Sequence, residues 1–370
     1  MGSIWGKQLK ISLFGESHGP AVGVVLDGLP PGQKVDLEEV ASFLARRAPG
    51  RSSWSTARKE TDEPHILSGL YRGRTCGTPL CAVIENKDAR PEDYRDRARI
   101  PRPSHADYTG KMRYHGFNDP RGGGHFSGRL TAGLCFAGAV AKQILSERNI
   151  FVGARIAAIG EILDQVLDST QITGADLAAV AAKRFPVFSD EQGRKMVELI
   201  ELVREEGDSV GGIIECIALG MPAGVGDPLF GGVKATLSSI LHGIPAVMGV
   251  SFGAGFASSK LRGSENNDSF LIDAVGRVGT ATNRAGGING GITNGMPIVV
   301  NVGIKPTATL SQPQASVDLR TGEPTTVVDT GRHDPCIVPR AVPVVEAAVA
   351  IGLLDLLLVA FGVQGPFWLD

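Results

Sequence analysis

The sequence lacks the cysteine and histidine patterns of metal sites and disulfide frameworks. Its five cysteines are an odd number, are widely spaced and include no C-x-x-C pair. Its seven histidines include no H-x-x-x-H pair. We therefore predict no metal site, and we expect a reducing, cytoplasmic setting.

The sequence also lacks an excess of charge of either sign and a membrane or export segment. Lys and Arg number 37 and Asp and Glu 39, so no overall field attracts nucleic acid or an anionic membrane, and any anion site must be local. Residues 1–10 hold no apolar run typical of a secretory signal. The apolar stretch 342–363 carries Glu346 and Asp355, which favours a buried helix over a membrane span.

No G-x-G-x-x-G follows a strand and opens a helix, which argues against the competing doubly wound nucleotide-binding fold. Glycine is abundant instead, at 49 of 370 residues, about twice the usual share. We predict one α+β domain over residues 1–370 with two loosely similar halves and long functional loops near 48–64 and 85–125. The expected strands are 10–14, 21–26, 211–219, 246–252 and 298–304, and the expected helices are 36–47, 128–145, 189–206, 233–241 and 342–363.

The segment GESHG at residues 15–19 fits the G-x-S-x-G pattern of a serine hydrolase. That nucleophile needs a helix directly after the serine, whereas Pro20 and the β-prone run 21–26 predict a second strand. Two interpretations remain, a polar hairpin turn and a loop in which Ser17 and His18 face a ligand.

Residues 99–129 contain His105, the triple glycine 122–124 and Arg129, and they lead into the predicted helix 128–145. Gly122 to Gly124 are expected to present backbone N–H groups to an anion at the helix start. Arg129 would lie in the first helical turn, where a cation is unfavourable unless an anion lies nearby. His105 is either a proton donor near neutral pH or an ordinary surface histidine.

Two later segments have the same polar character. The first is the Gly/Asn loop 286–295, which either binds a ligand or forms ordinary hairpin turns. The strand after this loop leads into KPTAT, residues 305–309, whose lysine and hydroxyls suit a phosphate or a polyol chain. In GRHDPC, residues 331–336, Asp334 stands among cations and is either an ion-pair partner or a base. The basic cluster 46–59, taken with Arg129 and Arg340, favours a small phosphorylated carboxylate over RNA as the ligand.

Taken together, six blocks make the chain resemble the chorismate synthase family from Phe14 to about Leu357. They are GESHG, RPSHADYTGK, RGGGHFSGR, AGGINGGITNG, KPTAT and GRHDPC, in the family's order and approximate spacing. The resemblance implies a β-α-β sandwich, with helices between antiparallel sheets, and a homotetramer.

The resemblance also implies an activity, the 1,4-anti elimination of phosphate from 5-enolpyruvylshikimate 3-phosphate to give chorismate. This is the last common step of the shikimate pathway to aromatic amino acids, and it requires reduced FMN without net redox change. NADPH is a possible reductant, and a separate flavin reductase a possible partner.

By motif, His105 would protonate or hold the flavin, His18 would assist the departing phosphate, and Asp334 would work with the flavin in deprotonation. Flavin contacts are implied for His125, Phe126, Ser127, Ala246, Gly290, Lys305, Pro306, Thr307, Ala308, Thr309 and Arg332. Substrate or NADP contacts are implied for Ser17, Arg47, Arg51, Arg129 and Arg340.

Three positions depart from the common family pattern. His125 stands where many members have arginine, Pro245 replaces an asparagine, and Ser53 aligns with the second arginine of the NADPH site. These changes weaken the expectation that the enzyme reduces its own FMN. Besides the lyase, a hydrolase and a noncatalytic binder of flavin or phosphate are the alternative functions.

Overall fold

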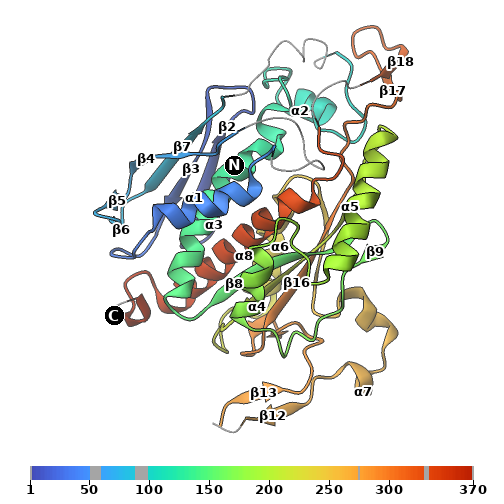
Figure 1. The fold of residues 1–370 in the computed structure, drawn as a ribbon. Coiled ribbons are helices and arrows are strands. Elements are labelled where there is room, and N and C mark those ends of the chain that lie inside the picture. The colour runs from blue at the N-terminus through green and yellow to red at the C-terminus, as the bar shows by residue number, and fades with distance from the viewer. Residues whose placement is uncertain (1, 51–59, 88–98, 274–275, 329–332, 369–370) are drawn as a thin grey trace.

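Two antiparallel sheets enclose a layer of helices in the computed structural model (Figure 1). The structure describes residues 2–50, 60–87, 99–273, 276–328 and 333–368. The predicted fold class, with helices packed between antiparallel sheets, is confirmed.

The first sheet comes from the N-terminal part of the chain and has the order β1-β2-β3-β7-β4. In its central strand, Val22, Val24 and Leu26 alternate toward the interior and are almost fully buried. The strand bounds are β1 Ile4–Trp5, β2 Lys10–Gly15, β3 Ala21–Asp27, β4 Pro64–Ser68 and β7 Leu80–Glu85.

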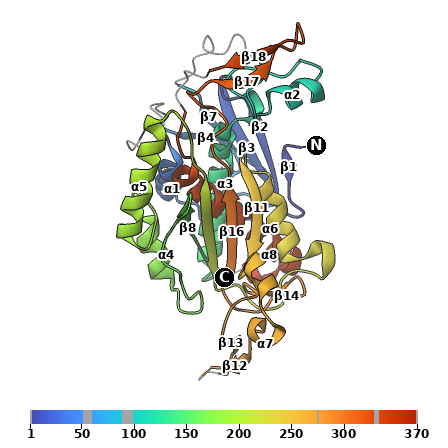
Figure 2. The ribbon, with the colours of Figure 1, turned by 90° about the vertical axis from the view of Figure 1, so that its right-hand side faces the viewer.

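The second sheet has the order β11-β16-β10-β8-β9, and all its strand pairs are antiparallel (Figure 2). The first sheet thus comes from residues 4–85 and the second from residues 151–304. The bounds are β8 Phe151–Ile159, β9 Ile162–Leu163, β10 Gly212–Leu219, β11 Val247–Phe252 and β16 Ile298–Ile304.

The helices α3 (Thr131–Ser146) and α8 (Val338–Phe361) pack against each other between the sheets. Their close approach depends on Gly138, where an added Cβ would lie 2.2 Å from Ala347 Cβ. The acidic residues of α8 are buried and paired: Glu346 binds Arg46 and Lys142, and Asp355 accepts the backbone N–H groups of residues 7–9. Helix α8 is long and apolar enough to span a membrane, but 83% of its most apolar 18-residue stretch is buried inside the protein. The prediction of a buried core helix is therefore confirmed.

Two further helices complete the inner layer, α1 (Leu37–Arg47) and α6 (Val233–His242), while α4 (Gly174–Ala181) and α5 (Asp190–Glu205) cover the other face of the second sheet (Figures 1 and 2). The predicted N-caps Asp36 and Ser189 both accept backbone N–H groups at their helix starts. All five cysteines are described, and none forms a disulfide.

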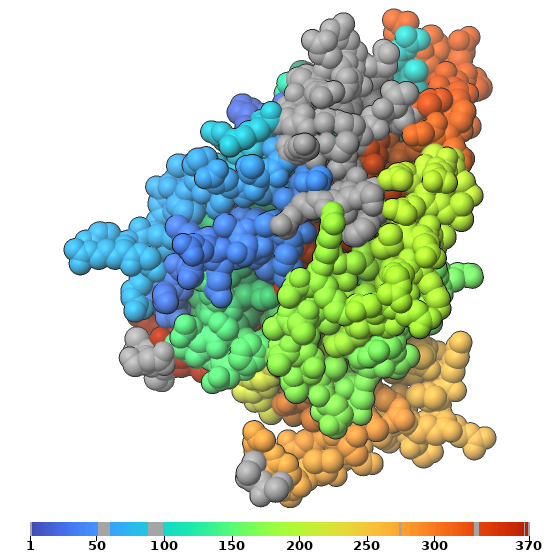
Figure 3. Space-filling view, in the orientation of Figure 1, coloured from blue at the N-terminus to red at the C-terminus, as the bar shows by residue number. Residues whose placement is uncertain are grey.

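Small elements extend from this body. The β5–β6 hairpin projects on one side, and a segment with α7, β12 and β13 projects at one end (Figure 3). The bounds are β5 Leu70–Tyr71, β6 Arg74–Thr75, α2 Asp107–Arg113, α7 Gly263–Asn266, β12 Phe270–Ile272, β13 Val278–Thr280, β14 Ile288–Asn289, β15 Ile292–Thr293, β17 Gln314–Val317 and β18 Pro324–Val327.

One expectation about the loops is wrong. The segment 85–125 is not wholly irregular, because it contains α2, whose seven residues are too few to show an apolar period in the sequence. The predicted loop 48–64 is described only in part, and β4 begins within it at Pro64.

Candidate active site

A buried ion cluster joins α1, the segment before β4 and the start of α3. Asp62 binds the guanidinium groups of both Arg47 and Arg129, and Arg47 Nε also donates to Thr131 Oγ1 at 3.1 Å. Burial alone would raise the pKa of Asp62, but the two guanidinium groups outweigh it and hold that pKa below its usual range. Two predicted substrate-binding arginines therefore lie side by side around one carboxylate.

Asn86 connects this cluster to the loop that carries His18. Its Oδ1 accepts Arg129 Nε at 2.8 Å, and its Nδ2 donates to the carbonyls of Glu16 and Gly19, both at 2.9 Å. The position of the 16–19 loop is thus fixed relative to Arg129.

Asp334 lies on the other side of the cluster. Arg340 donates from Nη1 to Asp334 Oδ2 at 2.5 Å and from Nε to the carbonyl of Arg47 at 3.1 Å. Thr307 Oγ1 donates to the Asp334 carbonyl at 2.9 Å, which brings the KPTAT segment to the same place. The sequence predicted Asp334 to be either a base or an ion-pair partner, and the structure shows that it forms an ion pair with Arg340.

Gly122 and Gly123 lie against the two predicted catalytic histidines. A Cβ at Gly122 would lie 2.2 Å from the His18 ring, and one at Gly123 would lie 3.4 Å from His105 Nε2. Both glycines have positive φ, which other residues rarely adopt. This glycine turn therefore brings His18 and His105 into one region.

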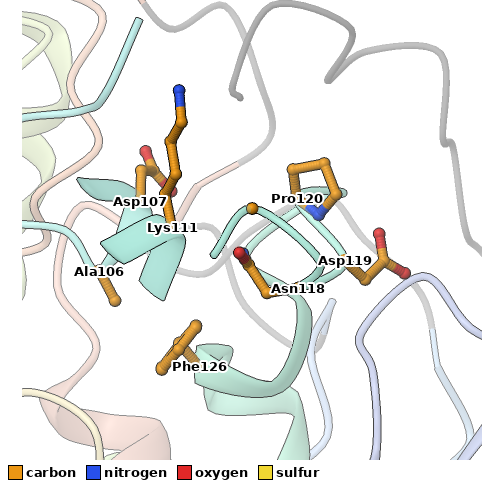
Figure 4. Close-up of a pocket in the computed structure, with 9 residues that line it drawn as sticks. Ala106, Asp107, Lys111, Asn118, Asp119, Pro120 and Phe126 are labelled. Atoms are coloured by element: carbon orange, nitrogen blue, oxygen red, sulfur yellow. The ribbon is translucent and has the colours of Figure 1, made fainter. Parts of the chain in front are cut away.

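A cavity opens beside this turn (Figure 4). Asp107 and Lys111 of α2 line one side of it, Asn118, Asp119 and Pro120 the other, and Phe126 its base. Lys305 reaches the same loop, since its Nζ donates to the carbonyl of Ser104 at 2.7 Å. Phe126 and Lys305, predicted cofactor residues from two distant segments, therefore lie in one region.

His125 holds three segments together. Its Nδ1 lies 2.9 Å from the Gly15 carbonyl and its Nε2 lies 2.8 Å from Ser3 Oγ. The carbonyl can only accept, so Nδ1 carries a proton, and in the neutral imidazole Nε2 accepts from the hydroxyl. The imidazole is thus bound to the N-terminal segment and to the end of β2.

The predicted anion site at the triple glycine is wrong for two of the three residues. The N–H groups of Gly123 and Gly124 donate to the carbonyl of Arg121 at 2.8 and 2.9 Å. The helix α3 begins only at Thr131, and Arg129 lies in a 3-10 turn before it. The anion that compensates Arg129 is Asp62 of the chain itself.

The nucleophile elbow of a hydrolase is also excluded. Ser17 is 1% exposed, its Oγ lies 3.1 Å from His18 Nδ1, and β3 rather than a helix follows it. The serine is a buried member of the loop beside Gly122.

Not every predicted site residue is brought to this region. Gly290 lies in the turn between β14 and β15, before β16, whereas Lys305 follows β16, so the two lie at opposite ends of the second sheet (Figure 2). Ala246 lies near Lys305, whose backbone N–H donates to its carbonyl at 3.0 Å. Arg51 and Arg332 lie outside the described residues.

Sequence reasoning missed Asp62, Asn86, Arg102 and Asp107. Asp62 and Asn86 stand in polar runs next to strands, KETDE at residues 59–63 and ENKD at 85–88, and nothing in their neighbours shows that they face Arg129. Asp107 lies in the RPSHADYTGK block, two residues after His105, and this spacing is the one sequence signal that could have indicated their contact.

Comparison with known proteins shows the family. The family model described as chorismate synthase matches residues 9–358. The chain belongs to the chorismate synthase family. It is accordingly an enzyme of the carbon–oxygen lyase class.

The relatives match over nearly their whole length. The chain is 49% identical to "Chorismate synthase" of Pyrococcus abyssi over 95% of this chain and 97% of the relative, and 44% identical to that of Acaryochloris marina over 97% of each. A solved structure, "Crystal Structure of Chorismate Synthase", superposes with a TM-score of 0.75 at 28% identity and covers 97% of this chain and 94% of that one.

Proposed function

We propose that the chain converts 5-enolpyruvylshikimate 3-phosphate to chorismate by 1,4-anti elimination of phosphate, with reduced FMN required and no net redox change. One observation carries the proposal: a continuous set of contacts joins Asp334, Arg340, Arg47, Asp62, Arg129 and Asn86 to the loop of His18. Acid, base and anion-binding groups are thereby held in fixed relative positions.

The arginines suit a substrate with two carboxylates and a phosphate. Guanidinium groups bind such anions with two parallel hydrogen bonds. Arg47 and Arg129 are 3% and 4% exposed, and both bind the carboxylate of Asp62, while the buried carboxylate of Glu60 also acts on Arg129. His18 would donate a proton to the departing phosphate, and Asp334, held by Arg340, would take part in removing the ring hydrogen.

The residues around the glycine turn fit a flavin mononucleotide. Lys305, Ser127 and the hydroxyls of Thr307 and Thr309 suit its phosphate and ribityl chain, and Gly123 places no side chain against the Cε1–Nε2 edge of His105. Reduced flavin would supply electron density to the substrate ring as phosphate leaves. His105 would hold the flavin at its Nε2 edge or, in its imidazolium form, donate a proton to it from Nε2.

We also propose a cytoplasmic homotetramer. Exposed apolar side chains gather on the edge strand β11 and on the projecting β12–β13 segment, where Met248, Phe270 and Ile272 are each about two-thirds exposed or more. Gly290 is distant from Lys305 within one chain, so its flavin contact would have to come from a second copy. Five unpaired cysteines support the reducing compartment.

The proposed roles are tested with His18→Ala, His105→Ala and Asp334→Asn in an anaerobic assay with chemically reduced FMN. Each should lower the rate of chorismate formation about 10²-fold or more, the usual effect of losing a positioned acid or base. Flavin and substrate binding without turnover in the wild type would support the noncatalytic binder instead. Fluorophosphonate labelling of Ser17 would revive the hydrolase, and we expect none.

A further inference from the structure

Asp107 is bonded to His105 as well as to Arg102. Its Oδ1 lies 2.7 Å from His105 Nδ1 and 2.7 Å from Arg102 Nη2. Its Oδ2 accepts Arg102 Nε at 2.8 Å and the Arg102 backbone N–H at 2.9 Å. The carboxylate is 7% exposed and the guanidinium 2%, so the pair is rigid and removed from water.

This arrangement determines which ring nitrogen of His105 carries the proton. Arg102 Nη2 also lies 3.0 Å from Nδ1, but both nitrogens converge on Oδ1, and an ionised carboxylate is the stronger acceptor. Nδ1 therefore donates to Asp107. In the neutral imidazole, Nε2 is then the unprotonated nitrogen.

The Nε2 edge of His105 is the edge next to the glycine turn of the cavity. A Cβ at Gly123 would lie 3.4 Å from both Cε1 and Nε2, and Gly123 lines the cavity. Lys305 holds the preceding residue, Ser104, whose φ is +56°. The backbone and the side chain of this loop are thus fixed independently.

We propose that Asp107 is a positioning residue for His105, which holds the imidazole with its proton on Nδ1 and presents Nε2 to the ligand in the cavity. The proposal rests on the proposed function, in which His105 acts on the cofactor. Asp107 itself need not touch a ligand. Asp119 provides a comparison, because it forms a similar carboxylate–guanidinium pair, with Arg121, on the opposite side of the cavity.

The tautomer is measured by nitrogen-15 NMR of the full chain labelled at histidine, at about pH 8, where a free imidazole is neutral. His105→Gln identifies the signals of His105. We expect the wild type to show a protonated Nδ1 and an unprotonated Nε2. The opposite tautomer in the wild type would overturn the proposal without any variant.

Substitution gives the second test. In Asp107→Ala the His105 signals should shift toward the Nε2–H tautomer, whereas Asp119→Ala should leave them unchanged. The double variant Arg102→Leu, Asp107→Leu, which leaves neither an unpaired guanidinium nor an acceptor for Nδ1, serves where Asp107→Ala leaves Arg102 unpaired and the chain unfolds. Identical His105 signals in the wild type and in the folded Asp107 variants would contradict the proposal.

The kinetic test follows kcat and KM separately. With Asp107→Ala we expect kcat to fall about 10- to 100-fold, with KM for the substrate nearly unchanged, and Asp107→Glu to restore part of kcat. An unchanged kcat would refute the positioning role. The NMR readout needs no turnover, so failure of the proposed reaction and failure of this inference are distinguishable.

Discussion

Asp62 and Arg129 form an ion pair in which the residues are 2% and 4% exposed, although they are separated by 67 residues in the chain. Arg47 binds the other oxygen of the same carboxylate. The carboxylate therefore holds together two guanidinium groups that would otherwise repel each other.

Asp62→Ala leaves two buried cations without this carboxylate. We expect the free energy of unfolding to fall by about 3–5 kcal/mol, the usual cost of removing one partner of a buried pair. Urea denaturation measures this. The control is Asp190→Ala, which removes a solvent-exposed pair with Lys183 and should change the free energy of unfolding far less. Equal effects of the two substitutions would contradict the proposed importance of the cluster.

The same pair gives a pH dependence of stability. The folded-state pKa of Asp62 lies below its ordinary value of 3.8, so the contribution is fully present above about pH 4 and is lost as the pH falls toward the folded pKa. Glu346, whose burial is outweighed by Lys142 and Arg46, adds a loss in the same direction below its ordinary 4.5. We expect unfolding free energies measured from pH 6 to pH 3 to fall less steeply for Asp62→Asn than for the wild type.

Gly122→Ala should displace His18. The new Cβ would lie 2.2 Å from the His18 ring and 3.0 Å from Ser17 Oγ, so the ring must move. We expect about a 10²-fold loss of kcat, similar to His18→Ala. The matched control is Gly32→Ala, which has φ +80° but no heavy atom within 4 Å. It should cost about 1 kcal/mol of stability and keep the wild-type kcat. Wild-type kcat in Gly122→Ala would show that His18 need not occupy this position.

Gly138→Ala tests the packing of the central helices. Its Cβ would lie 2.2 Å from Ala347 Cβ, so α3 and α8 must separate, and we expect a loss of about 1–3 kcal/mol in unfolding free energy. The double variant Gly138→Ala, Ala347→Gly should recover part of it. Strict additivity of the two single effects would show that the helices do not meet as closely as described.

The regular elements were predictable from the sequence because local signals determine them. Strands 10–14 and 298–304 alternate or run apolar between turns, and Asp36 and Ser189 mark helix starts. Helix α3 begins three residues later than the predicted start at Gly128, because Gly128 to Leu130 form a 3-10 turn.

The candidate site was predictable only where a motif or the family resemblance named its residues. His18, His105, Arg129 and Asp334 were predicted in this way. The partners Asp62, Asn86 and Asp107 depend on contacts through space that have no periodic signal, and the turn of α2 is too short to show one. The internal bonds from the triple glycine to the Arg121 carbonyl belong to a local turn of positive φ, a conformation that glycines permit but do not require.

The most direct measurement of the central claim is an anaerobic assay with 5-enolpyruvylshikimate 3-phosphate and FMN reduced by dithionite, followed by detection of chorismate and phosphate. A parallel aerobic reaction replaces dithionite with NADPH. We predict that chorismate forms in the anaerobic reaction with dithionite. If chorismate also forms in the aerobic reaction with NADPH, the enzyme reduces its own flavin. No chorismate in either arrangement, from a chain that binds both ligands, would contradict the proposed elimination.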